Sequence, residues 1–246
     1  MADRIQSLLT QVNTLKATNR QLKQAVHQLT ARTKVHISSS FDAGNIQVVD
    51  ASDPSNITLK LREETFTIVD GKSHKQWFYF RVSNAKDTKC VFNIVNAGEA
   101  SYADAYKGYW ACGSADRKSW GRVPTTYIDG RLTISVTPST ELFWISYFAP
   151  YSYEQHQELV TRCMESPLCE LEVLGQTLDG RDIECLHIGK GAAKIWVTAR
   201  QHPGETQAEW WMEGFLARLL DPDDSVAAGL RESATFFVVP NMNPDG

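Results

Sequence analysis

Hydrophobic residues recur with different periods along this chain, and each period predicts a different kind of structure. Over residues 1–34, β-branched and leucine residues fall on the a and d positions of four heptads: Ile5, Leu8, Val12, Leu15, Leu22, Val26 and Leu29. Leucine at d, β-branched residues at a and a single polar a position, Asn19, favour a parallel two-stranded coiled coil. We therefore expect a homodimer through residues 5–29. The alternative is one amphipathic helix that packs on its own chain.

Residues 35–150 change to a period of two, which is typical of strands with one buried face. Ile57, Leu59 and Leu61 alternate with polar residues, and similar short runs follow, separated by turn formers. Many short strands with such punctuation predict an antiparallel β-sandwich. The same region holds an aromatic-rich stretch that would suit either a sugar- or peptide-binding surface or ordinary packing: Tyr102, Tyr106, Tyr109, Trp110, Trp120 and Tyr127.

Residues 151–246 combine helical and strand periods, as expected for an α/β unit. The second of its helices is expected to carry its apolar residues at Ala208, Trp211, Phe215 and Leu219. In chain order, the pattern predicts a helix at 154–164, strands at 170–174 and 182–188 around the turn Asp179-Gly180, a buried strand at 195–199, a helix at 206–220 and a buried strand at 234–239.

The expected fold class is therefore multi-domain α+β, with a coiled-coil helix at 1–34, a β-sandwich at 35–150 and a partial α/β domain at 151–246. At 246 residues, of which 42% are hydrophobic, the chain is long enough to bury a substantial core. Five cysteines, an odd number without a C-x-x-C pattern, indicate a reducing compartment. No apolar run reaches the ~20 residues of a membrane span. We expect a cytoplasmic protein that binds neither membrane nor nucleic acid.

The candidate chemistry lies between the strand at 195–199 and the helix that follows. His202 and Glu205 stand there, three residues apart, with Pro203 and Gly204 making the turn. In open α/β sheets, ligands bind at the carboxyl ends of strands. Imidazole nitrogen and carboxylate oxygen are ordinary Zn²⁺ ligands, and a catalytic zinc takes three protein ligands and leaves a fourth position to water. His202 and Glu205 are therefore candidate metal ligands, although the H-x-x-E pattern alone is a weak signal.

Four segments give this pair a context: Phe148-Ala-Pro-Tyr-Ser-Tyr153, Leu174-Gly-Gln-Thr-Leu-Asp-Gly-Arg181, Thr198-Ala-Arg-Gln-His-Pro-Gly-Glu205 with its continuation Thr-Gln-Ala-Glu-Trp-Trp211, and Val239-Pro-Asn-Met-Asn-Pro-Asp-Gly246. In this order they resemble the zinc carboxypeptidases of the M14 family, most closely the cytosolic carboxypeptidase branch, and the resemblance covers residues 36–246. It implies one Zn²⁺ per protomer held by His202 and Glu205, and release of C-terminal residues from peptides or proteins.

The resemblance also implies parts that these residues do not supply. In the M14 family the third zinc ligand is a downstream histidine, the general base is a downstream glutamate, and the groups that grip the substrate carboxylate lie beyond the segment matched by Gly246. We therefore assign no catalytic residue within the chain, and expect it to be a fragment that is inactive alone. Arg200 is the nearby cation, and we expect it to form a salt bridge on the rim of the sheet.

Two other functions remain open. Acylases of the same fold use an H-x-x-E pair to cleave N-acyl amino acids, which makes an amidohydrolase the alternative enzyme; the predicted β-domain favours the peptidase. A non-catalytic dimeric binding module, built from the coiled coil and the sandwich, is the alternative outside enzymology. The remaining histidines have no neighbours at ligand spacing, and we expect them to be surface or core residues: His27, His36, His74, His156 and His187.

Overall fold

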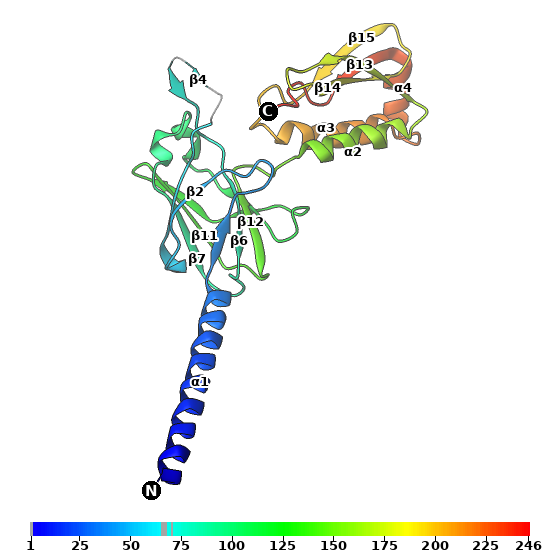
Figure 1. Ribbon diagram of the computed structural model, residues 1–246. Coiled ribbons are helices and arrows are strands. Elements are labelled where there is room, and N and C mark those ends of the chain that lie inside the picture. Colours follow the sequence, from blue (N-terminus) through cyan, green and yellow to red (C-terminus); the bar gives the residue numbers. More distant parts are fainter. Residues whose placement is uncertain (1, 65–67, 70) are drawn as a thin grey trace.

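The computed structural model describes residues 2–64, 68–69 and 71–246 of the chain. It has a mixed α/β architecture, with a long helix at one end, a β-rich part in the middle and an α/β part at the other end (Figure 1). In the described ranges, no helix combines the length and hydropathy needed to cross a bilayer. All five cysteines are free and buried.

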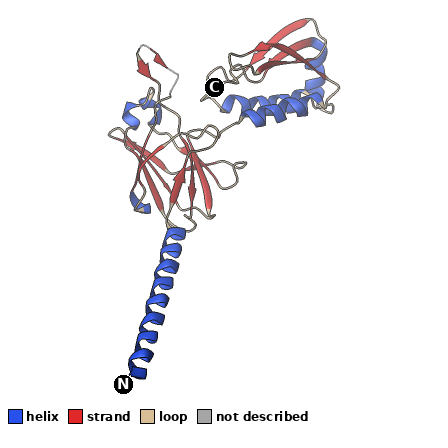
Figure 2. Ribbon diagram, viewed as in Figure 1, coloured by secondary structure: helices blue, strands red, loops and turns tan. Residues whose placement is uncertain are grey.

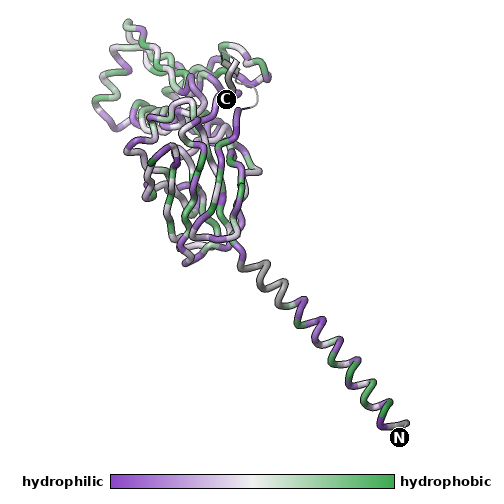
Figure 3. Tube along the Cα trace, turned by 90° about the vertical axis from the view of Figure 1, so that its left-hand side faces the viewer, coloured by the Kyte–Doolittle hydropathy of each residue, from purple (hydrophilic) through white to green (hydrophobic). Residues whose placement is uncertain are grey.

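The first helix, α1 (Ala2–Thr33), extends away from the rest of the chain (Figure 1). Apolar residues recur along it between polar ones (Figure 3). Its predicted seam is exposed where the side chains are described, up to 69% for Leu15, so this part of the helix does not pack on its own chain. The side chains of Val26 and Leu29 lie outside the described residues. The helical period is thus observed, while the coiled-coil partner stays a prediction.

Two five-stranded sheets occupy most of the range in which the sequence predicts a sandwich (Figure 2). The first has the order β1 (His36–Ser38), β6 (Tyr79–Ser83), β12 (Leu142–Ser146), β8 (Ala111–Ser114) and β9 (Gly121–Val123). The second has the order β10 (Thr125–Ile128), β11 (Arg131–Val136), β7 (Cys90–Ile94), β3 (Ile57–Lys60) and β2 (Gln47–Asp50). A two-stranded hairpin, β4 (Ile68–Val69) with β5 (Lys72–Ser73), and three 3-10 turns, Pro54–Asn56, Ala97–Glu99 and Ala103–Tyr106, complete this part.

The expectation of purely antiparallel pairing is wrong at one position. β3 runs parallel to β7, with Ile57 opposite Phe92 and Leu59 opposite Ile94. A parallel pair needs a long crossover rather than a tight turn, and residues 61–89 separate these two strands. The period of two still holds, because alternate residues of both strands are buried in a single core with residues of the other sheet.

Most of the aromatic-rich stretch serves this core. Tyr106 is fully buried, and its hydroxyl donates to the carbonyl of Gln76 at 2.8 Å. Its ring meets those of Tyr109, Tyr127 and Tyr147 at centroid distances of 5.7–5.8 Å. Offset and edge contacts of this kind favour packing. Of the six residues in the stretch, Tyr102 and Trp110 are the large apolar side chains that stay well exposed.

The α/β part is a four-stranded sheet with helices on one face (Figure 2). The strand order is β13 (Cys169–Gln176), β14 (Asp182–Ile188), β16 (Ala234–Val239) and β15 (Ala193–Thr198), and only the β15–β16 pair is parallel. α2 (Tyr153–Met164) and α3 (Gln207–Leu219) pack on Leu186, Ile188 and Val238 of the sheet. Ser152 and Gln155 close a reciprocal capping box at the start of α2.

Three expectations for this part are corrected. The buried face of α3 holds Met212, Leu216 and Leu219, whereas Trp211 is 57% exposed and stacks on Phe215. Of the predicted face, Leu219 is buried and Ala208 and Phe215 pack partly buried against the core, so the correction concerns Trp211. The strand at 195–199 is an edge strand with Trp196 58% exposed, not a buried one. A further helix, α4 (Ser225–Ser233), begins after Asp224, whose carboxylate accepts from the amides of Val226 and Ala227.

Gly191 should be intolerant of substitution, because a Cβ there would lie 1.9 Å from the carbonyl carbon of Ser233 and 2.0 Å from the nitrogen of Ala234. We expect Gly191→Ala to destabilise the chain by about 1–3 kcal/mol, as overpacking does. Gly214→Ala in α3 is the control, since nothing lies within 4 Å of its Cβ position and alanine favours a helix by up to about 1 kcal/mol. Urea unfolding followed by tryptophan fluorescence measures both, and equal stability of the two variants would contradict the expectation.

Candidate functional site

The two predicted metal ligands lie side by side on the loop that joins β15 to α3. Nδ1 of His202 is 3.0 Å from Oε2 of Glu205, and the two side chains are 74% and 52% exposed. The amide of Glu205 donates to the carbonyl of His202 at 3.1 Å, which closes the turn through Pro203 and Gly204. A histidine nitrogen and a carboxylate oxygen therefore face the same open space just past the carboxyl end of a strand, where α/β sheets bind ligands.

Backbone contacts fix the base of this loop. The Ala199 amide donates to Val239 at the end of β16, and the Ala199 carbonyl accepts from the amide of Met242. Nδ2 of Asn243 donates to the carbonyl of Gln201 at 3.3 Å. Arg200 has a φ of 49°, in the left-handed region that non-glycine residues seldom occupy. The backbone thus reverses just before His202.

The segment Asn243–Gly246 packs against the loop from one side and against a hairpin turn from the other. A Cβ on Gly246 would lie 2.2 Å from Cγ of Pro203, so the two segments are in close contact. The carboxylate of Asp245 accepts from the Thr177 hydroxyl at 2.7 Å and from the Asp179 amide at 3.3 Å. Three motifs that are far apart in the sequence therefore meet around His202 and Glu205.

Arg181 completes this junction from the hairpin side. Its Nη1 donates to the carbonyl of Pro244 at 2.7 Å and lies 3.6 Å from Oδ1 of Asp245. Its guanidinium also stands 4.9 Å from the ring centroid of Tyr153, the first residue of α2. The turn residues predicted at Asp179-Gly180 are thus confirmed as a turn, and their neighbours hold the Asn243–Gly246 segment in place.

His202 and Glu205 fit a divalent metal as two adjacent donors. Both are accessible and point to one space, and their chemistry suits Zn²⁺. Over the part of the chain that the structure describes, no group of three or more His, Cys, Asp or Glu side chains is arranged to hold a metal. His202 and Glu205 are thus two candidate ligands, where a catalytic zinc takes three from the protein.

Behind the loop lies a buried cluster of charged residues that sequence reasoning missed. His156 is 0% exposed, with Nδ1 3.1 Å from Oε1 of Glu209 and Nε2 3.2 Å from Oε2 of Glu184. Glu209 also pairs with Arg200. Burial alone would lower the pKa of His156, but hydrogen bonds to the two carboxylates outweigh it and raise the pKa to about 9. The imidazole is therefore held as a cation at neutral pH.

Each member of this cluster comes from a different element: His156 from α2, Glu184 from β14, Glu209 from α3 and Arg200 from the loop. Arg200 forms a salt bridge as expected, but it lies inside the molecule and not on the rim of the sheet. A signal for Glu209 exists in the sequence, because it shares one helical face with Met212 and Leu216. A polar residue on the buried face of a helix needs a partner.

Comparison with known proteins decides the family. The profile of the cytosolic carboxypeptidase N-terminal domain matches residues 37–148, and the zinc carboxypeptidase profile of M14 peptidases matches residues 156–246. The chain belongs to the M14 zinc carboxypeptidase family. The resemblance expected from the motifs is thus confirmed for nearly the whole chain after α1.

Relatives within the M14 family extend well beyond the matched region. An uncharacterised protein of Zymomonas mobilis is 46% identical over 213 residues, which are 86% of this chain and 54% of that protein. Cytosolic carboxypeptidase 2 of Danio rerio is 30% identical over 85% of this chain and 33% of its own length. A metallo-carboxypeptidase of Pseudomonas aeruginosa, solved in complex with (2-guanidinoethylmercapto)succinic acid, has a TM-score of 0.80 at 43% identity over 86% of this chain and 56% of that one. This M14 chain thus spans about half the length, or less, of these relatives.

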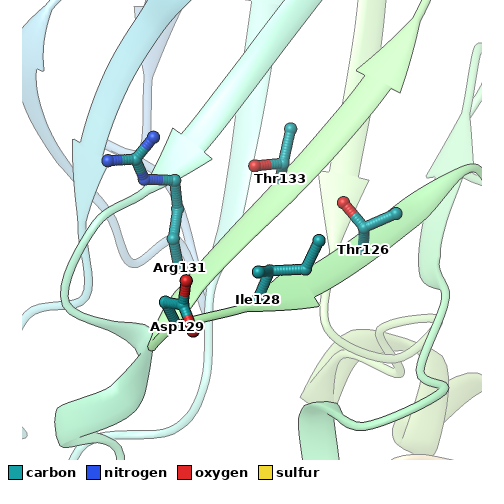
Figure 4. A pocket seen from close by; sticks show the side chains of 5 residues that line it. All are labelled: Thr126, Ile128, Asp129, Arg131 and Thr133. Carbon is teal, nitrogen blue, oxygen red and sulfur yellow. The ribbon is translucent and has the colours of Figure 1, made fainter.

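A separate surface pocket lies in the β-rich part of this M14 chain. It is lined by Thr126 and Ile128 of β10 and by Asp129, Arg131 and Thr133 of the adjoining turn and β11 (Figure 4). None of these residues belongs to the loop that carries His202 and Glu205 or to the motifs around it. The pocket therefore plays no part in the candidate site.

Protonation of His156 should make the stability of the chain depend on pH. Because its pKa is about 9 when folded and near 6.5 as a free side chain, the stabilisation is fully present below pH ~6.5 and is lost as the pH rises through ~9. We expect the free energy of unfolding of wild type to exceed that of His156→Gln by on the order of 2–3 kcal/mol at pH 6, and by clearly less at pH 9.5. Urea unfolding at both pH values measures this difference.

The control for this experiment is His187→Gln. His187 also lies beside a carboxylate, with Nε2 2.8 Å from Oε2 of Glu172, but the two side chains are 29% and 55% exposed. Exposed pairs contribute about 0–1 kcal/mol, so this variant should stay close to wild type. A pH-independent deficit in His156→Gln would mean that the imidazole is buried as a neutral group.

Proposed function

We propose that this chain serves a zinc-dependent carboxypeptidase reaction, the release of C-terminal amino acids from peptides or proteins in the cytoplasm. The observation that carries the proposal is the meeting of three family motifs around His202 and Glu205 at the carboxyl end of β15. Membership of the M14 family and the names of the relatives support it. Because this chain covers 54%, 33% and 56% of the lengths of these three relatives, the activity of the whole protein is itself part of the proposal.

In this proposal His202 and Glu205 hold one Zn²⁺ per protomer. Zinc, when bound, polarises a scissile carbonyl and makes a water molecule nucleophilic near neutral pH. The residues of this chain contribute position: the turn from His202 to Glu205 sets the two donors side by side, and the Asn243–Gly246 segment fixes the turn from one side. No described residue is assigned as third ligand or general base.

The amidohydrolase alternative uses the same pair of donors, so the metal loop does not separate the two reactions. The match of residues 37–148 to the cytosolic carboxypeptidase N-terminal domain favours the peptidase. The same match, joined to the zinc carboxypeptidase profile, disfavours a module that only binds.

The proposed metal site can be tested through its affinity for Zn²⁺, because the chain offers two candidate protein ligands. With two protein ligands, the 246-residue chain is expected to bind Zn²⁺ weakly and to release no amino acids from peptides, since each missing ligand leaves the ion more hydrated. His202→Ala and Glu205→Ala should each remove the residual binding, while His187→Ala, which alters another His–Glu pair, should leave it unchanged. Calorimetry with Zn²⁺ and a peptide-release assay measure the two properties. Tight binding or turnover would place a third ligand among the histidines expected to be surface or core residues, with His156 and His187 the first to test.

A longer form that supplies a third ligand and a general base should bind one zinc per protomer and release C-terminal residues. His202→Ala or Glu205→Ala in that form should abolish both zinc binding and activity. If the longer form cleaved N-acyl amino acids but no peptides, the amidohydrolase would replace the carboxypeptidase.

We also propose that α1 joins two copies of the chain in a parallel coiled coil through residues 5–29. The support is a seam that is apolar and exposed along the described positions, with Asn19 as its single polar a position. Exposed leucines on an isolated helix are poorly stabilised in water, and pairing would bury them.

Removal of α1 should change the oligomeric state of the chain in solution. Light scattering is expected to give a dimer for the whole chain and a monomer for a chain that starts at Val35. Asn19→Val should raise the stability of the dimer and loosen its choice of oligomer. The same number of copies per particle for both chain lengths would rule out the helix pair.

A further inference from the structure

Arg200 lies directly before the metal loop, yet its side chain points away from the solvent that His202 and Glu205 face. It is 9% exposed, whereas both metal-loop side chains are more than half exposed. Its guanidinium donates to three acceptors on different segments: Nε donates to the carbonyl of Pro203 at 3.2 Å, and Nη1 donates to the carbonyl of Tyr151 at 2.6 Å and to the carboxylate of Glu209.

The acceptor at Pro203 belongs to the turn between the two metal ligands themselves. Arg200 therefore contacts the loop from its buried side, at the backbone between His202 and Glu205. Its left-handed backbone, with φ of 49°, costs a non-glycine residue roughly 1–2 kcal/mol. Such a conformation persists where surrounding contacts determine it. Here the reversal is what lets the side chain reach back under its own loop.

The other two acceptors fix Arg200 to the body of the α/β part. Glu209 on α3 is shared with His156 on α2, and His156 is in turn paired with Glu184 on β14. Gln157 donates to the second oxygen of Glu184 at 2.9 Å. The charges alternate along this buried chain of four side chains, so each is balanced by its neighbours.

Tyr151 belongs to the segment that leads from β12 into α2, and this segment is bound at a second point next to the loop. The carbonyl of Ala149 accepts from the Thr206 hydroxyl at 2.8 Å and from Nε1 of Trp210 at 3.1 Å. Thr206 directly follows Glu205. The connecting segment therefore accepts hydrogen bonds from Arg200, which precedes His202, and from Thr206, which follows Glu205.

We propose that Arg200 is a positioning residue for the metal pair, and that the buried chain Arg200–Glu209–His156 transmits the positions of α2, α3 and the connecting segment to the loop that carries His202 and Glu205. The inference rests on the proposed function for its purpose, but its geometry does not require the metal. Substrate recognition by Arg200 is not part of it, since the guanidinium is buried and its acceptors lie within the protein.

Arg200→Lys tests the proposal while keeping the charge, because an ammonium cannot reach three acceptors in the planar arrangement of a guanidinium. We expect hydrogen exchange of the amides from Gln201 to Thr206, including the Glu205 amide, to become about tenfold faster, while the amides of β16 exchange as in wild type. Residual Zn²⁺ affinity should fall by about tenfold, the usual effect of losing a group that orients a metal ligand.

Arg162→Lys is the matched control. Arg162 also joins α2 to α3, through a 2.7 Å contact of Nη2 with Oε1 of Glu213, but it touches no part of the loop. It should leave loop exchange and zinc affinity unchanged. The proposal would be wrong if amide exchange in the loop of Arg200→Lys stayed as in wild type. It would also be wrong if exchange in the loop and in β16 rose together, because Arg200 would then contribute only to general stability.

A measurement on the wild-type chain covers the case in which Arg200→Lys fails to fold. The Nε proton of Arg200, bonded to Pro203, should exchange with water far more slowly than that of the half-exposed Arg162, and equal rates would overturn the proposal. If wild type bound no zinc at all, the proposed metal site would fail, whereas the exchange experiments would still decide whether Arg200 orders the loop.

Discussion

The arrangement of helices, sheet and loop in the α/β part depends on the buried carboxylate of Glu209. It accepts from Arg200 and faces His156, and it is fully buried. Removing a carboxylate of this kind from water costs several kcal/mol unless the charge is balanced. Two cations meet it from opposite sides, and the second cation is itself satisfied by Glu184. The cost of burying the charge thus forces α2, α3, β14 and the loop into one arrangement.

In the proposed metal site, accessibility and orientation come from different sides of the loop that carries His202 and Glu205. The donors of His202 and Glu205 must be accessible, so few side chains can pack around them. Hydrogen bonds hold the backbone of this loop instead: the Arg200 guanidinium donates to Pro203, the Asn243 amide to Gln201, and the Thr206 hydroxyl to Ala149. Directional hydrogen bonds do here what apolar packing does elsewhere in the sheet, where Leu186, Ile188 and Val238 form the core.

The sequence predicted the parts of this structure that depend on local pattern. The helices at α2 and α3, the hairpin around Asp179-Gly180 and the His202–Glu205 pair all follow from residues within one or two turns of each other. The Arg200–Glu209–His156 chain could not be predicted in this way, because His156 and Glu209 are 53 positions apart. Their pairing depends on how two helices pack on the sheet, and the predicted apolar face of α3 was itself wrong at Trp211.

The edge position of β15 has a consequence for how this chain behaves in solution. In the described part of the sheet, β15 bonds to β16 along one side only, with Ile195 and Trp196 exposed. A parallel edge strand with apolar side chains is a template for strand addition, which has no natural limit on copy number. Growth along such an edge produces open, fibre-like assemblies, whereas a pair of helices closes at two copies. The charge of Lys194 is the feature of β15 that opposes such polymerisation.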